Sequence, residues 1–77
     1  MNSITLWNAE KDKSYTVESI LLENLIARRL EALGINEGTV IKVLTKKKSG
    51  AMVVKVRGTR LALGKAITSV IEVREAV

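Results

Sequence analysis

The sequence offers few of the side chains on which enzymes and metal sites depend. It contains no histidine and no cysteine, so it lacks imidazole bases, thiolate nucleophiles, disulfides and the usual ligands of zinc, copper or iron–sulfur clusters. Its serines and threonines therefore have no histidine to activate them as nucleophiles. We expect a protein that is not an enzyme, with no catalytic residues and no cofactor.

The carboxylates could bind a hard cation, but their spacing does not form a known ligand loop. A calcium loop gathers several oxygen ligands within about twelve residues. The carboxylates here are scattered singly along the chain, at Glu10, Asp12, Glu18, Glu23, Glu31, Glu37, Glu72 and Glu75. The sequence therefore predicts no metal site, and weak cation binding by single carboxylates is left open.

The positive charge of the chain points to an anionic partner. Lysine plus arginine number 13 and aspartate plus glutamate 8, a formal net charge of +5, which favours nucleic acid, an anionic membrane or an acidic protein surface. The run Lys46, Lys47, Lys48 could hold phosphate by charge or keep an exposed hairpin tip soluble. Single-strand binding relies on aromatic stacking, and the aromatic residues are only Trp7 and Tyr15. We therefore expect no nucleic acid.

A helix predicted over residues 22–33 supplies further candidate contacts. Leu25 lies on the apolar face of this helix. At 100° per residue, Arg29 falls inside that apolar arc and Arg28 at its margin. The Arg29 stem could pack on the protein while its guanidinium meets a carboxylate or carbonyl, or the guanidinium could be presented to an acidic partner. Trp7 leaves a similar choice between covering one end of the fold and anchoring an interface.

The elements that must position these side chains are mainly short strands. Alternating and β-branched segments predict strands over residues 4–6, 15–22, 39–45, 51–57, 59–63 and 70–73, where the second strand combines the alternating residues 15–18 with the apolar run 20–22. One helical turn is predicted at 65–69. The last strand is expected to pair near the first, so that the sheet has no long bare edge. This pattern predicts a mainly β protein, a small barrel.

One amphipathic helix is predicted over 22–33, between the second and third strands. It follows from apolar positions at a three-four spacing, Leu22, Leu25, Ile26, Leu30 and Leu33. Gly34 can end the helix because glycine adopts a positive φ without a Cβ penalty. Gly38 is expected in the turn before the next strand, and Gly58 in a hairpin turn that needs a positive φ.

Length and hydropathy predict one domain spanning 1–77. The 77 residues fit a single compact core. No run of roughly 18 apolar residues occurs, and the first residues carry no basic leader. We therefore expect a cytoplasmic protein without direct membrane insertion.

Three segments carry a resemblance to the FeoA family. Residues 28–38, Arg-Arg-Leu-Glu-Ala-Leu-Gly-Ile-Asn-Glu-Gly, are similar to the family's Arg-Leu-x-x-Leu-Gly-(Ile/Leu)-x-x-Gly segment. Residues 54–63 resemble its final hairpin, and 71–73 its closing strand. The sequence departs from the family pattern at 11–13, where a Lys-Pro-Gly turn is common, and at Gly64, where arginine is frequent. These departures touch turns and surface more than the apolar pattern.

The resemblance implies an SH3-like barrel of five to six short strands with one helix between strands two and three. It also implies a cytosolic accessory or regulatory protein of bacterial ferrous iron uptake, which interacts with the membrane transporter FeoB or its GTPase domain. Candidate partner-binding residues are Leu25, Arg28, Arg29, Lys46, Lys47 and Lys48. The alternative is a basic barrel that binds nucleic acid or acts as a repressor-like regulatory domain. Weak homo-oligomerisation is a further option.

Overall fold

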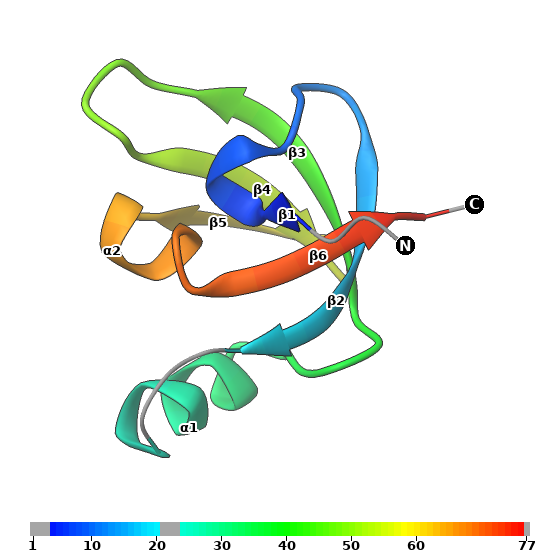
Figure 1. Cartoon of the computed structure of the whole chain (residues 1–77), viewed down its shortest axis with the longest axis vertical. Helices are drawn as coiled ribbons and strands as arrows, with labels where there is room; N and C mark the ends of the chain where they lie inside the picture. The colour runs from blue at the N-terminus through cyan, green and yellow to red at the C-terminus, as the bar shows by residue number, and fades with distance from the viewer. Residues whose placement is uncertain (1–3, 21–23, 77) are drawn as a thin grey trace.

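The computed structural model describes residues 4–20 and 24–76, with only the backbone of residues 24–26. Strands dominate this part of the chain, and Figure 1 shows how they surround a common interior. The elements follow in the order β1 (Ile4–Thr5), the 3-10 turn η1 (Leu6–Asn8), β2 (Ser14–Ile20), α1 (Asn24–Ala32), β3 (Val40–Lys46), β4 (Met52–Val56), β5 (Thr59–Leu63), α2 (Lys65–Thr68) and β6 (Ile71–Glu75).

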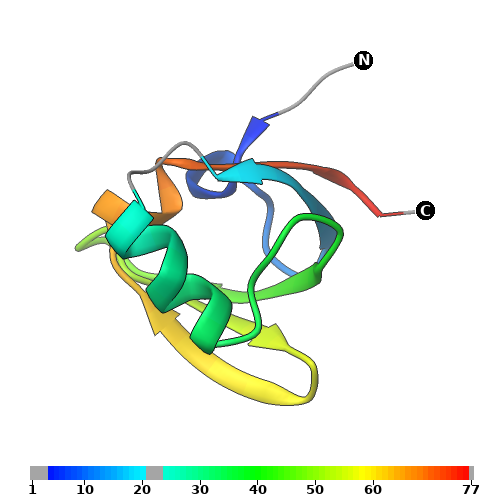
Figure 2. The ribbon, with the colours of Figure 1, turned by 90° about the horizontal axis from the view of Figure 1, so that it is seen from below.

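All described strands belong to one antiparallel sheet that curls on itself. The strand order is β1-β6-β2-β3-β4-β5, and Figure 2, seen from below, shows the sheet wrapped round the interior. The pairing register shifts between Val17 and Ser19 against β6, and between Val43 and Thr45 against β4. Such bulges bend a strand and increase its twist, so they help the sheet to close into a barrel. The predicted SH3-like fold is confirmed.

The core consists of side chains that alternate along the strands, as expected for a sheet with one buried face. Tyr15 and Val17 of β2 lie opposite the buried positions of β3 and β6. The buried apolar residues are Leu6, Ala9, Tyr15, Val17, Leu30, Ile35, Ile41, Val43, Met52, Val54, Val56, Leu63, Ile71 and Val73. β1 pairs with β6 through Ile4 and Val73, so the predicted contact between the first and last strands is present.

The end of α1 is fixed by a Schellman motif. The Gly34 N–H donates to the Glu31 carbonyl at 2.9 Å, and the Ile35 N–H donates to the Leu30 carbonyl at 2.8 Å. Gly34 has φ +87°, the left-handed conformation that this motif places after the last helical turn. Leu30 and Ile35 are both buried, and this apolar pair accompanies the motif. The motif therefore ties the helix to the core.

The predicted helix is present, and α1 ends at Ala32, one residue before the predicted bound. Leu33, assigned to the apolar arc, is 48% exposed. The reason is the left-handed residue that follows, which turns the chain so that Ile35 takes the core position. Leu21 and Leu22, expected in the second strand, lie outside the described residues. The first strand is shorter than expected, because Leu6 already belongs to η1.

The β4–β5 hairpin has a two-residue turn. Arg57 has φ +52° and Gly58 φ +82°, and Val56 pairs directly with Thr59. Positive φ at both central residues is the type I′ pattern, whose twist matches that of paired strands. Gly58 thus has the conformation expected for it, whereas Arg57 adopts one that non-glycine residues rarely take.

Candidate interaction surfaces

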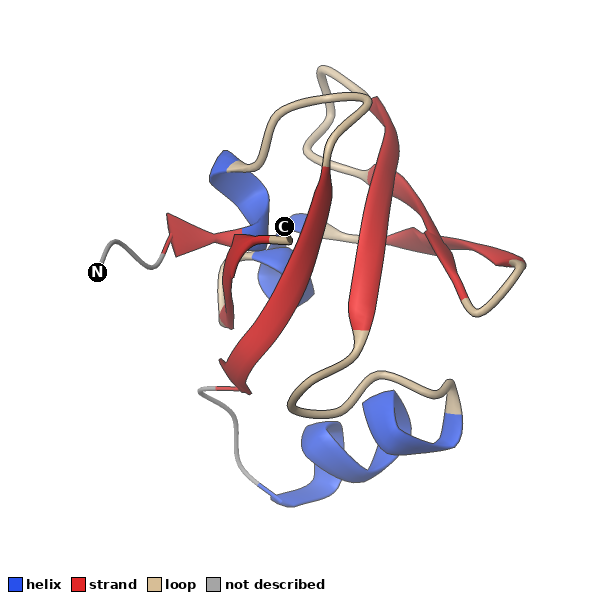
Figure 3. Ribbon diagram, turned by 90° about the vertical axis from the view of Figure 1, so that its right-hand side faces the viewer, coloured by secondary structure: helices blue, strands red, loops and turns tan. Residues whose placement is uncertain are grey.

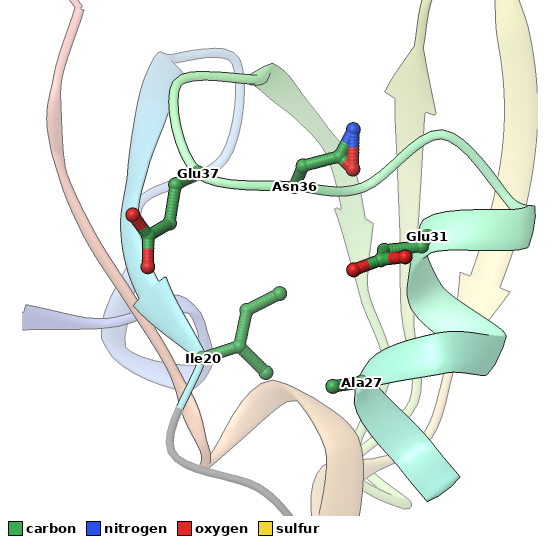
Figure 4. Close-up of a pocket in the computed structure, with 5 residues that line it drawn as sticks. All are labelled: Ile20, Ala27, Glu31, Asn36 and Glu37. Carbon is green, nitrogen blue, oxygen red and sulfur yellow. The ribbon is translucent and has the colours of Figure 1, made fainter. Parts of the chain in front are cut away.

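A hollow lies between α1 and the barrel. It has a volume of about 310 Å³ and is lined by Ile20, Ala27, Glu31, Asn36 and Glu37; we call it the α1 hollow. Figure 3 shows α1 standing beyond the ends of β2 and β3. In Figure 4 the two apolar side chains lie close together, with the two carboxylates on opposite sides of the hollow. The site combines an apolar floor with an acidic rim. It could not be recognised from the sequence, because no motif links these five positions.

The loop that forms one wall of the hollow is held by Thr39, which is 7% exposed. Its Oγ1 accepts a hydrogen bond from the Asn36 N–H at 3.0 Å and donates one to the Gly34 carbonyl at 3.3 Å. The loop is joined to β2 by two backbone bonds, from the Gly38 N–H to the Val17 carbonyl and from the Val17 N–H to the Thr39 carbonyl. Gly38 has φ +88°, which allows this reversal.

The outer surface of α1 carries two of the predicted contact residues. Arg28 and Arg29 are both exposed, and neither forms an ion pair with a residue that the structure describes. Arg29 therefore reaches solvent although its position falls within the predicted apolar arc. The Leu25 side chain lies outside the described part of the structure. Leu33 adds an exposed apolar side chain next to the arginines.

The lysine run lies at the other end of the barrel, beside Trp7. The Nζ of Lys46 is 5.5 Å from the centre of the Trp7 ring, and the Nζ of Lys65 is 5.1 Å from it. Both distances fall within the range of cation–π attraction. Trp7 is half-buried and packs against the core, so it both covers this end of the barrel and remains accessible. We call the residues Trp7, Lys46, Lys47, Lys48 and Lys65 the basic end.

The structure thus separates the predicted contact residues into two groups. Figure 1 places α1 at the bottom of the molecule and the β3–β4 turn at the top. Sequence reasoning found the lysine run and the arginines but missed Lys65 and the residues of the α1 hollow, because they come from segments far apart in the chain.

The ion pairs of the described residues lie elsewhere, around β2 and β6. The Lys13 Nζ is 3.1 Å from the Glu10 Oε2 and 3.5 Å from the Glu75 Oε1. Both carboxylates raise the pKa of Lys13, and the hydrogen bond to Glu10 contributes most to this increase. Arg74 Nη1 is 3.7 Å from the Glu18 Oε1. Within 4–20 and 24–76, carboxylates do not gather in groups of three that could hold a metal ion.

No helix within the described ranges is long and apolar enough to cross a membrane.

The sequence model of the FeoA domain matches residues 4–75, nearly the whole chain. The chain belongs to the FeoA family. The crystal structure of an iron uptake regulatory protein (FeoA) shares 25% identity with it, over 99% of this chain and 100% of that one, with a TM-score of 0.86. A FeoA-like protein from Clostridium acetobutylicum shares 26% identity, over 100% and 91% of the two chains, with a TM-score of 0.87. No curated protein sequence matches.

The FeoA fold also occurs in larger proteins. A manganese-dependent transcriptional repressor in complex with manganese is 22% identical and has a TM-score of 0.90, over 99% of this chain and 38% of its own. At this identity the likeness concerns the fold alone. Membership of the FeoA family supports a role in ferrous iron transport, and the predicted family is confirmed.

Proposed function

We propose that this chain is a non-enzymatic, cytoplasmic accessory protein that regulates ferrous iron uptake by docking on the GTPase domain of a FeoB-type membrane transporter. Family membership supports the iron-transport role. Residues 1–77 would act together as one domain, because the strands described here share one sheet.

The observation that carries the docking proposal is the α1 hollow. This hollow exposes Ile20 and Ala27 between two carboxylates. Interfaces of this kind have an apolar centre and a polar rim. Glu31 and Glu37 favour a partner that inserts an apolar side chain with a lysine or arginine beside it, because the carboxylates then accept charge-assisted hydrogen bonds. The transporter's GTPase domain is the occupant that we propose.

Exposed residues on other faces of α1 and just after it stay candidate contacts of the same partner. Leu33 gives an apolar contact at the end of α1. Arg28 and Arg29 can bind carboxylates of the partner in a bidentate manner. Leu25, on the first turn of the same helix, stays a predicted contact.

The test is binding of the purified GTPase domain to an Ala27→Arg variant. Ala27 lines the hollow without belonging to the core cluster, so the larger side chain fills the site and should weaken binding at least tenfold. Ala62→Arg is the matched control, because Ala62 is exposed on β5 and does not line the hollow. Equal binding by the two variants, measured by calorimetry, would exclude this docking face. Binding of duplex DNA in place of the GTPase domain would contradict the proposed function.

A further inference from the structure

We propose that the basic end of the barrel binds the surface of an anionic lipid bilayer, independently of any protein partner. The first observation is the concentration of charge. The lysine run 46–48 and Lys65 are all exposed, and none forms an ion pair with a described carboxylate. Their charges are therefore not neutralised by the ion pairs that the described residues form.

Local structure holds these lysines together at one end. The Gly50 N–H donates to the Lys47 carbonyl and the Lys47 N–H to the Ala51 carbonyl, so the turn is ordered and presents Lys47 and Lys48 at its tip. A Cβ added at Gly50 would lie 3.0 Å from the Lys65 Cβ, which shows that the turn contacts the start of α2. Figures 1 and 2 both show the turn and α2 on the same side of the molecule.

The second observation is Trp7, whose ring centre lies within 5.5 Å of the Nζ atoms of both Lys46 and Lys65. Its half-buried indole has an apolar body and a polar edge, and tryptophan is enriched at the headgroup level of membranes for that reason. Clustered lysines bind anionic lipid through the surface potential, at roughly a fivefold gain in affinity for each lysine near the surface. Together the two signals give reversible attachment without insertion.

A bilayer fits these residues better than nucleic acid or a specific phosphate site. The described cations here are all lysines, which act as point charges and lack the planar fork with which arginine binds carboxylate or phosphate in a bidentate manner. Trp7 is a single aromatic residue, whereas stacking of bases uses several. The lysines also lie on a projecting turn and helix, which suits a broad, flat anionic surface.

The experiment is co-sedimentation of the full chain with vesicles of phosphatidylglycerol and phosphatidylcholine, compared with phosphatidylcholine alone. Trp7 is the only tryptophan, so its emission reports directly on this end, and we expect a blue shift with anionic vesicles only. The double variant Lys47→Gln/Lys48→Gln should bind roughly 25-fold more weakly, since two lysines are lost. Lys55→Gln/Arg60→Gln removes the same charge at the far end of the β4–β5 hairpin and should bind like the wild type.

Three results would overturn the proposal. One is an equal loss in both double variants, which would mean that only net charge matters. Another is an unchanged Trp7 emission on saturating anionic vesicles. The third is binding to a short DNA duplex as tight as binding to the vesicles at physiological ionic strength, which would assign the basic end to nucleic acid. The transporter is absent from these assays, so their outcome does not depend on the proposed docking at α1.

Discussion

Gly58 illustrates how backbone conformation alone can determine the cost of a substitution. Its φ is +82°, and a Cβ added there would meet no atom within 4 Å. The full cost of Gly58→Ala is therefore the strain of a left-handed residue, about 1–2 kcal/mol. We expect the free energy of unfolding to fall by this amount in urea titrations, with an unchanged m value.

Gly64 is the matched control for this prediction. It also has no atom within 4 Å of an added Cβ, but its φ of −75° is one that any residue adopts. Gly64→Ala loses the N-cap preference for glycine but makes the unfolded chain less flexible, which stabilises the fold, so the two effects should largely cancel and change the unfolding free energy by about 0.5 kcal/mol or less. If the two alanine variants lose the same stability, the strain argument for the hairpin turn is wrong.

At the residue scale, the sequence predicted conformations better than contacts. The need for a positive φ at Gly34 and Gly58 follows from residue type and local pattern. The positive φ of Arg57 could not be predicted, because the two-residue turn imposes it through strand pairing. The approach of Lys46 and Lys65 to Trp7 could not be predicted either, because η1, β3 and α2 meet only in the folded barrel.

At the scale of elements, the loop between α1 and β3 depends on one hydroxyl. Thr39→Val removes the bond from the Asn36 N–H and the bond to the Gly34 carbonyl, leaving both groups unpaired beside a buried side chain. We expect a loss of about 1–3 kcal/mol of stability and fast hydrogen exchange at the Asn36 amide. The measurements are urea unfolding and amide exchange by NMR.

Thr39→Ser keeps the hydroxyl and loses only a methyl group, so it should cost about 1 kcal/mol or less and leave the Asn36 amide protected. A slow-exchanging Asn36 amide in the valine variant would show that Thr39 does not order this loop. Since Asn36 and Glu37 line the α1 hollow, the valine variant should also bind the GTPase domain more weakly than the serine variant.

Element type was predictable here, and element ends less so. Strand alternation and the three-four spacing of leucines indicated the strands and α1 because burial imposes those periods. Leu33 was wrongly assigned to the buried arc because the chain turns at the left-handed Gly34, so that Ile35 takes the core position instead. The hollow was not predictable at all, since it depends on how far α1 stands from β2.

At the scale of the whole molecule, the two proposed surfaces predict two separable binding activities. When the transporter sits in an anionic bilayer, attachment through the basic end raises the local concentration of the α1 surface near its partner. Lys47→Gln/Lys48→Gln should therefore weaken binding to the transporter in anionic vesicles but leave binding to the soluble GTPase domain unchanged. Ala27→Arg should weaken both.

The combined variant decides whether the two surfaces act independently. Distant sites without shared partners contribute additively to binding free energy, so in anionic vesicles the fold-losses of Ala27→Arg and Lys47→Gln/Lys48→Gln should multiply. In neutral vesicles only the Ala27→Arg loss should remain, because the lysines then have no surface charge to bind. A lysine variant that weakens binding to the soluble domain as much as to the vesicles would instead place the basic end within the protein interface, and the two ends would then contact one partner.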